Sequence, residues 1–254
     1  MKKYITLIAL LAAGSTFAHA EQLATLSTLM SEGTTVGTVT DLSFNYAERD
    51  TVYSFDGAQV GLTDEQVVNT LAGNTGIIVI ASWIKLDTNA SQYNTIFGWG
   101  EAGTGFKFGT KNDDLFLVTK NVKESVKNFS IAKDVWTLVA LQYNLENKQF
   151  RLTATETNGQ FYTVTDNTVV NPVTTQQFSI GSANGNATSG NENFDGLIGN
   201  LTIYTVSGWQ NNSDIYNVLG GAPTLIPEPS AFGLLAGLGA IALVGTRRRK
   251  NFKA

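Results

Sequence analysis

This 254-residue chain has almost none of the histidine and cysteine side chains on which many catalytic and metal sites depend. The sequence contains no cysteine, and its one histidine, His19, lies in an apolar stretch near the N-terminus. A Ser-His-Asp triad and an H-E-x-x-H zinc site need histidine, and thiolate nucleophiles and thiolate metal sites need cysteine. The composition therefore excludes chemistry that depends on histidine or cysteine from any mature chain that begins after His19.

Trp99 and Tyr93 are the aromatic residues best placed to bind a ligand. Trp99 lies in "GWGEAGTG", at the end of an expected strand and beside flexible loops, and Tyr93 precedes the same strand. An exposed aromatic ring can stack on the face of a sugar. We therefore expect these two residues to bind sugar, with packing in the core or at its rim as the alternative. Trp83 and Trp136 lie in apolar strands and should be core residues, and Trp209 should pack the segment that leads into a closing helix.

Residues 1–20 have the pattern of a secretory signal peptide. Lys2 and Lys3 precede an apolar stretch, and Ala18 and Ala20 have the spacing that signal peptidase recognises. We expect cleavage before Glu21 and export of the remaining chain.

The region between the two ends of the chain is strongly acidic. Residues 21–226 contain ten Lys and Arg residues and 20 Asp and Glu residues, which gives a formal net charge of −10, against −4 for the whole chain. Such a domain repels phosphate backbones, so we expect no nucleic-acid partner. Because it lacks disulfides, it must be stabilised by its packed core.

The central region has the pattern of many short strands separated by turn residues. Residues 76–86 are apolar on both faces up to Lys85, as expected of a strand between two sheets, and residues 42–46 form another strand candidate. Residues 134–144 and 148–156 should form a hairpin. About a dozen strands at this spacing predict an all-β sandwich or jelly roll.

Two segments have the pattern of helices. Residues 63–73 begin with a possible cap and end at glycine. Residues 212–221 should be capped by Ser213 or Asp214 and end at two glycines.

Several of these segments resemble the LamG-like, concanavalin A-like jelly roll. They are "IASWIKLD", "DVWTLVALQYNLENKQFRLTATETNG", "FSIGS" and "FDGLIGNLTIYT". We assign the domain to residues 41–221, with residues 21–40 as an N-terminal extension. Gly199 and Asn200 stand where many bacterial members carry an acidic residue after the position of Ile198.

The resemblance implies two kinds of site. LamG-like domains often hold calcium at the rim of the sandwich, and Asp56, Asp113 and Asp195 are the candidate ligands, with Asp114 beside them. Asp before Gly and an Asp pair are also ordinary turn chemistry. Related glycoside hydrolases carry a Glu-x-Asp-x-x-Glu strand, and this sequence has no such run. The resemblance therefore favours a non-catalytic domain over a divergent glycosidase.

The C-terminal region resembles a PEP-CTERM sorting signal. It consists of a linker at 222–229 that ends in the triplet Pro227, Glu228 and Pro229, an apolar helix at 230–246, and a basic tail at 247–254 that begins with Arg247, Arg248 and Arg249. A helix of about 17 residues spans about 26 Å, just under a bilayer core of about 30 Å. The basic tail should stay in the cytoplasm.

The resemblance implies that an exosortase-type membrane protease cuts near the triplet. The protein would then be an inner-membrane-anchored precursor that is passed to the cell surface or extracellular matrix of a Gram-negative-type bacterium. A permanent single-span anchor is the alternative. We expect a non-catalytic surface protein that binds glycan or extracellular polysaccharide, with a purely structural envelope or matrix protein as the alternative.

Overall fold

The computed structural model describes most of the chain between the two predicted targeting segments. The described residues are 21–47, 50–62, 76–90, 92–99, 106–119, 125–155, 161–165, 178–182 and 193–226. The expected signal peptide at 1–20, the helix expected at 63–73 and the residues from Pro227 onward lie outside them. No helix within the described ranges is long and apolar enough to cross a membrane.

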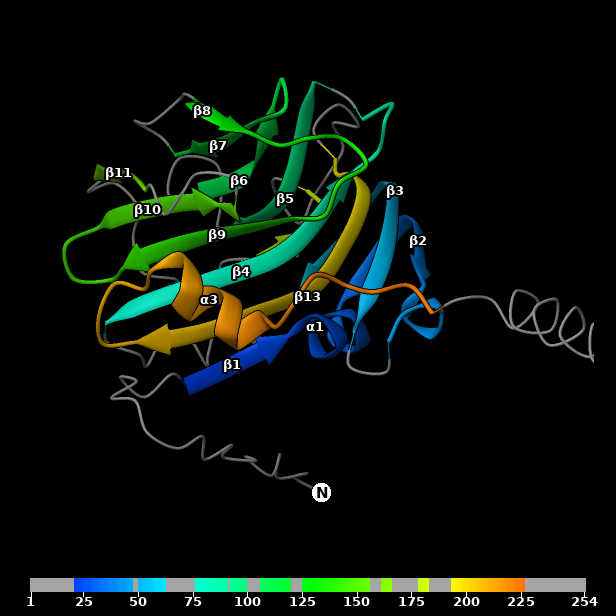
Figure 1. Ribbon diagram of the computed structural model, residues 1–254, viewed down its shortest axis with the longest axis horizontal. Coiled ribbons are helices and arrows are strands. Elements are labelled where there is room, and N and C mark those ends of the chain that lie inside the picture. The colour runs from blue at the N-terminus through cyan, green and yellow to red at the C-terminus, as the bar shows by residue number, and fades with distance from the viewer. Residues whose placement is uncertain are drawn as a thin grey trace, which may run out of the picture.

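Strands dominate the described residues (Figure 1). Their bounds are β1 Glu21–Thr25, β2 Thr34–Asp41, β3 Val52–Leu62, β4 Ile77–Leu86, β5 Tyr93–Trp99, β6 Phe106–Lys111, β7 Asp114–Val118, β8 Ser125–Ser130, β9 Thr137–Asn144, β10 Gln149–Ala154, β11 Tyr162–Thr165, β12 Phe178–Ile180 and β13 Asp195–Val206. The helices are α1 Leu26–Glu32, the 3-10 turn η1 Ser43–Asn45 and α3 Asn212–Leu219.

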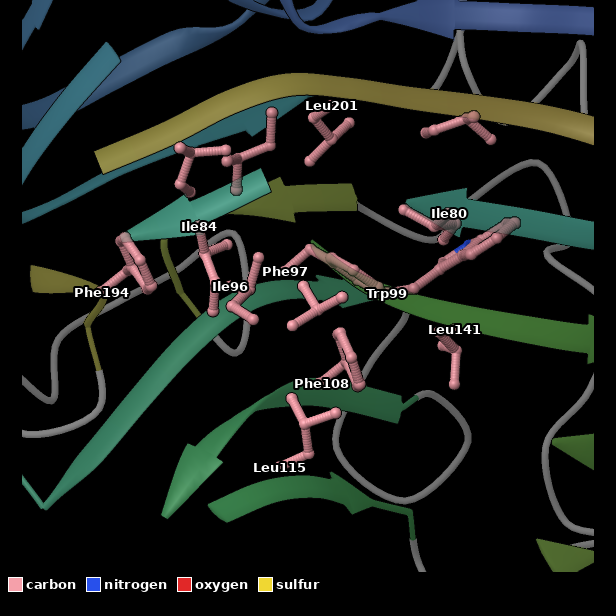
Figure 2. Close-up of a cluster of buried hydrophobic side chains, with 14 of the residues drawn as sticks. Ile80, Ile84, Ile96, Phe97, Trp99, Phe108, Leu115, Leu141, Phe194 and Leu201 are labelled. Atoms are coloured by element: carbon pink, nitrogen blue, oxygen red, sulfur yellow. The ribbon is translucent and has the colours of Figure 1, made fainter. Parts of the chain in front are cut away.

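The strands form two antiparallel layers that face each other. Hydrogen bonds connect them in the order β11-β10-β9-β4-β13-β3-β12-β5-β6-β7-β8, with β1 beside β13 and β2 beside β3. Ile80, Leu141 and Leu201 from one layer meet side chains of β5, β6 and β7 from the other (Figure 2). The predicted all-β sandwich is confirmed.

Strand β4 is buried on both faces for two different reasons. One face, which includes Ile80 and Ile84, points between the layers. The other face, which includes Val79 and Trp83, packs under Ile215 of α3 and not against a second sheet. The prediction that β4 is buried on both sides is confirmed, but on one side the helix covers it. The N-cap of helix α3 is Asn211, two positions before Ser213 and three before Asp214, the two expected caps, and Asp214 is instead the N3 residue of its capping box.

Residues 21–40 belong to the sandwich and are not an extension outside it. Strand β1 pairs with β13, and β2 pairs with β3 along almost its whole length. Thr25 caps α1 by accepting a hydrogen bond from the backbone N–H of Thr28, and Leu26 and Leu29 of this helix are fully buried in the core. The boundary predicted at residue 41 therefore falls at the end of a strand of the domain.

The expected strand at 42–46 is instead a 3-10 turn. The Asp41 carboxylate accepts a hydrogen bond from the backbone N–H of Ser43 at 2.9 Å, which turns the chain at the end of β2. After the turn, Tyr46 pairs with Leu225 in an isolated antiparallel bridge.

Residues 222–226 are also part of the fold, although we expected a linker there. Figure 1 shows this segment, in orange, running from α3 in front of β13 to the turn that connects β2 with β3. Pro223 is buried, and a Cβ atom added at Gly199 would lie only 2.7 Å from Pro223 Cγ. Gly199 therefore leaves the space in which the C-terminal segment packs.

Candidate functional site: the outer face of strand β5 and the acidic rim

Trp99 lies in the core and not on the surface. Its side chain is 2% exposed, and its ring packs against Phe106 and Phe178 at centroid distances of 5.7 and 6.1 Å. Figure 2 shows the ring close to Ile80 and Leu141 of the opposite layer. A buried ring offers no face to a sugar, so the prediction of Trp99 as a stacking residue is wrong, and the alternative of core packing is correct.

Tyr93 lies on the opposite face of β5, outside the sandwich. It is half-buried, and Lys111 is its partner across the β5–β6 ladder, with the ammonium 5.3 Å from the centre of the ring. The ring also meets Phe116 edge-on at 6.4 Å. Leu115 and Leu117 point into the core, so Phe116 between them points outward. The structure thus separates the two aromatic residues that we expected to act together.

The other three tryptophans pack as predicted, except that Trp136 is half-buried and lies at the edge of its cluster. Trp83 is buried, and its indole N–H donates to the carbonyl of Gly220 at 3.2 Å. Trp136 is half-buried at the edge of the same cluster, where it meets Tyr46 edge-on. Trp209 packs beside α3, with the Arg151 guanidinium 4.1 Å from its ring centre.

Two of the three candidate calcium ligands are neighbours. Asp56 of β3 and Asp195 of β13 are direct partners across the ladder. Burial raises the pKa of the Asp195 carboxyl, and the charges of Asp87 and Asp56 raise it further. This end of the sandwich therefore brings three negative charges close together.

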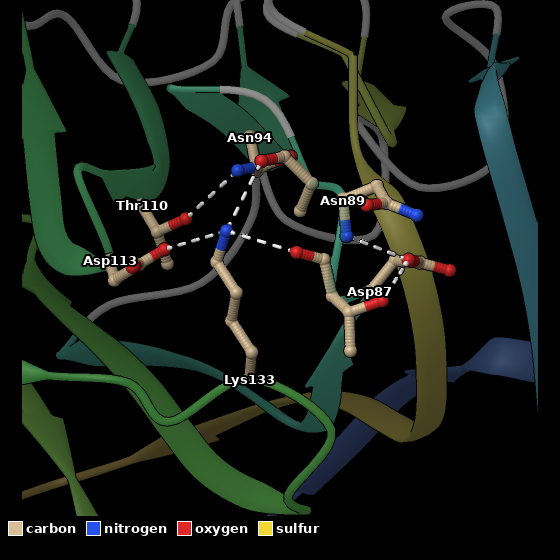
Figure 3. Close-up of polar contacts among 8 residues, drawn as sticks. Asp87, Asn89, Asn94, Thr110, Asp113 and Lys133 are labelled. Carbon is tan, nitrogen blue, oxygen red and sulfur yellow. Dashed lines mark hydrogen bonds and ion pairs between the residues drawn. The ribbon is translucent and has the colours of Figure 1, made fainter.

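The third candidate, Asp113, contacts a lysine and does not join this pair. Asn112 and Asp113 form the turn between β6 and β7, and both have positive φ, as the commonest two-residue hairpin turns require. Asp113 Oδ1 lies 3.8 Å from Lys133 Nζ, which also donates to the carbonyls of Thr88 and Ala90 at 3.4 Å each (Figure 3).

Lys133 was not among the residues that the sequence suggested. Its ammonium lies among a carboxylate and two carbonyl oxygens, the oxygen types that calcium prefers. The carbonyls belong to a turn that Asp87 closes by accepting hydrogen bonds from Asn89 N and Thr88 Oγ1. A positive charge is therefore already present here, and Asp113 does not fit the role of a calcium ligand.

The described residues do not assemble a larger metal site. Within those ranges, no group of three or more His, Cys, Asp or Glu side chains lies close enough together to hold a metal ion. Calcium takes six to eight oxygen ligands, so Asp56 and Asp195 supply only part of a coordination shell. Calcium at this pair stays a prediction.

The cleavage and sorting residues of both termini lie outside the described ranges. These are Ala18, Ala20, Pro227, Glu228, Pro229, Arg247, Arg248 and Arg249. The structure does include the segment that leads into the sorting signal, as far as Ile226.

Comparison with solved structures supports the same architecture. Domain 4 of AbnA, a GH43 extracellular arabinanase from Geobacillus stearothermophilus, superposes with a TM-score of 0.56 at 16% identity, covering 79% of this chain and 98% of that domain. The receptor-binding domain of botulinum neurotoxin mosaic serotype C/D gives a TM-score of 0.50 at 16% identity, and covers 80% of this chain but 50% of that one. No curated protein matches the chain.

Two family models match the sequence. The PEP-CTERM protein-sorting motif matches residues 225–250 and overlaps the last two described residues. This motif is typical of exported precursors that are sorted to the cell surface. The model of the concanavalin A-like lectin/glucanases superfamily matches residues 54–207, which is more than half of the chain and includes most of β3 and all of β4 to β13. The chain therefore belongs to the concanavalin A-like lectin/glucanase superfamily.

Proposed function

We propose that this chain is an exported surface protein whose sandwich domain binds extracellular glycan without catalysing a reaction. The observation that carries the proposal is the combination, in one chain, of a concanavalin A-like domain at 54–207 and a sorting motif at 225–250. Signal peptidase would cut before Glu21, and an exosortase-type protease would cut near Pro227 to Pro229 in the membrane of a Gram-negative-type bacterium.

Tyr93 is the residue we propose to contact the sugar. Its ring is partly exposed on the outer face of β5, whereas the ring of Trp99 is not. The face of a tyrosine ring packs on the apolar C–H surface of a pyranose or furanose, and its hydroxyl can hydrogen-bond a sugar hydroxyl. Lys111 beside it adds hydrogen-bond donors at the same surface.

An oligosaccharide is the natural first ligand to test. The arabinanase domain with the same fold was solved in complex with arabinotriose. That domain is 16% identical to this chain and shares its fold, so arabino-oligosaccharides are the first probes to try.

The test is a glycan array, followed by calorimetry, on a fragment containing residues 21–226. We expect the parent fragment to bind a subset of oligosaccharides and Tyr93→Ala to lose at least about tenfold in affinity, equivalent to about 1.4 kcal/mol. Tyr216→Ala is the matched control, because Tyr216 is an exposed tyrosine on α3 at a different surface. A parent fragment that binds no glycan would favour the purely structural alternative, and release of reducing ends would favour a glycosidase.

The sorting part of the proposal has a separate test. Mass spectrometry of the protein recovered from the cell surface should find a C-terminus near Pro229. A surface protein that retains residues 230–254 would instead be held by a permanent anchor.

A further inference from the structure

The segment before the sorting triplet is fixed to the domain by a buried carboxylate. Asp50 is 3% exposed, and its two oxygens accept hydrogen bonds from Asn200 Nδ2 at 3.1 Å and from the backbone N–H of Thr224 at 3.0 Å. Asn200 is itself tied to the backbone N–H of Thr51 at 2.8 Å. The contact therefore links β13, the start of β3 and the C-terminal segment.

A short backbone ladder extends this contact to the last described residue. The N–H of Ala47 donates to the carbonyl of Thr224 at 2.9 Å, and the N–H of Ile226 donates to the carbonyl of Asn45 at 2.8 Å. The sorting motif begins at residue 225, so its first two residues are part of the folded domain. No free linker separates the domain from Pro227.

The chain that remains before the predicted membrane helix is very short. From Ile226 to residue 230 there are four Cα–Cα steps, which span at most about 14 Å when fully extended. The headgroup region of each leaflet takes up about 5–8 Å of this length. In a membrane-anchored precursor, the surface around Ile226 is thus held within roughly 10 Å of the membrane surface.

Three exposed apolar side chains lie at that surface. Phe44 is 76% exposed, Leu225 is 62% exposed and Ile226 is 50% exposed. Leu225 and Ile226 lie on one side of the short ladder, opposite Tyr46 and Asn45, and Phe44 lies in the turn η1 directly before Asn45. We call Phe44, Leu225 and Ile226 the exit patch, because the chain leaves the domain there.

We propose that the exit patch rests on the lipid surface of the membrane while the precursor is anchored there. The proposal builds on the sorting part of the proposed function, because it requires residues 230–246 to span the membrane. Apolar side chains at a membrane surface enter the boundary between headgroups and acyl chains. The tether makes this contact intramolecular, so that even a weak attraction suffices to keep it formed.

The lipid contact would also position the cleavage site for the sorting protease. A domain seated on the membrane holds the Pro-Glu-Pro triplet at the headgroup level, where a membrane-embedded protease can reach it. After cleavage the tether is gone, and the same weak attraction no longer retains the domain. Because the contact is apolar and the domain carries a net charge of −10, it should persist in high salt.

The experiment uses the full-length chain from residue 21 onward, reconstituted in phosphatidylcholine vesicles. The sequence has no cysteine, so Asn45→Cys gives a single labelling site beside Phe44 for a polarity-sensitive fluorophore. Glu146→Cys, in the exposed turn between β9 and β10, provides the matched control position. Lipids that carry a quencher near the headgroup then report contact. Pelleting with vesicles after carbonate extraction reports separately whether the chain spans the membrane.

We expect quenching and a blue shift at position 45 and neither at position 146, in low and high salt. Phe44→Ser should reduce the quenching, and Asp50→Asn should reduce it by loosening the docked segment, with pelleting unchanged in both. Loss of pelleting would contradict the membrane span and hence the proposed function. Two outcomes would overturn the lipid contact itself. One is normal pelleting with no quenching at position 45. The other is quenching at position 45 that appears only after an exosortase-type protease is added to the vesicles. Quenching that survives Asp50→Asn would also overturn it, since the docked segment would then not determine the contact.

Discussion

Asp56 and Asp195 are direct partners on neighbouring antiparallel strands, so that two carboxylates project from opposed positions on one side of the ladder. Asp87, in the turn after β4, adds to the negative charge around Asp195. Like charges placed opposite each other destabilise a sheet, and the domain tolerates this arrangement in spite of its net negative charge.

We expect Asp195→Asn to stabilise the domain at neutral pH. The pKa of Asp195 is raised in the folded state by burial and by its acidic neighbours, so the ionised form opposes folding. This penalty is complete above the folded pKa and disappears as the pH falls through that pKa toward the unfolded value of about 4. The variant should melt about 1–2 °C higher at pH 7, for a repulsion of about 0.5 kcal/mol, with no difference near pH 3.

Asp56→Asn provides the matched comparison for this effect. Removing either charge removes the repulsion between the pair, so the double variant should gain less than the sum of the two single variants. Simple additivity, or a gain at pH 7 that persists at pH 3, would mean that the carboxylates do not interact in this way.

The same two variants test calcium binding. If Asp56 and Asp195 contribute to a calcium site, millimolar calcium should raise the melting temperature of the parent and have little effect on Asp195→Asn. The measurement is thermal unfolding with calcium or with EDTA. An identical response of parent and variant would exclude this pair as ligands.

We expect Lys133→Met to destabilise the rim. The ammonium joins Asp113 of the β6–β7 turn to the carbonyls of Thr88 and Ala90 after β4, and the Met side chain keeps the apolar stem but loses these contacts. The free energy of unfolding should fall by about 1 kcal/mol, as measured by denaturant titration.

Asp134→Asn is the control for a simple surface ion pair. Asp134 contacts Lys85 at 2.7 Å but is largely exposed, and its positive φ is also compatible with Asn. Its loss should cost less than about 0.5 kcal/mol. Equal effects of the two variants would mean that Lys133 is an ordinary surface lysine.

The fold was predictable because its signals are local. Alternating or continuous apolar runs, together with turn residues such as Asp113, predict the strands and hairpins. Which side chains of β5 face the core was not predictable, because a bulge between Thr95 and Phe97 shifts the register of the strand. Simple alternation places Tyr93 and Trp99 on one face, whereas the extra residue turns Phe97 and Trp99 into the core.

Contacts between segments that are distant in the sequence also could not be predicted from sequence patterns. Gly199 and Asn200 depart from the pattern of related domains, and the structure gives both a role in seating the C-terminal segment. The partner of each comes from a segment far away in the sequence, as does the set of oxygens around Lys133. Such juxtapositions depend on the completed sheet and leave no periodic signal.

The burial of Trp99 leads to two contrasting variants. Trp99→Ala should lower the free energy of unfolding by about 3–5 kcal/mol, because it leaves a large cavity between the layers. Trp99→Phe should cost much less, since the indole N–H has no hydrogen-bond partner among the described residues and its removal leaves nothing unpaired. Chemical denaturation measures both. A stable Trp99→Ala variant with altered sugar binding would instead place the ring at the surface.

Gly199→Ala tests whether the C-terminal segment is truly docked. The new methyl group would lie 2.7 Å from Pro223 Cγ and 3.4 Å from the Trp136 ring, so the segment must move away or the strand must shift. Few bonds hold the segment, whereas β13 pairs with β3 over residues 195–199 and with β4 over most of its length, so we expect the segment to move. Amide hydrogen exchange at Thr224 and Ile226 should become faster, with exchange in β13 at Ile203 and Tyr204 unchanged. Unchanged protection at Thr224 and Ile226 would show that residues 222–226 are not held against Gly199.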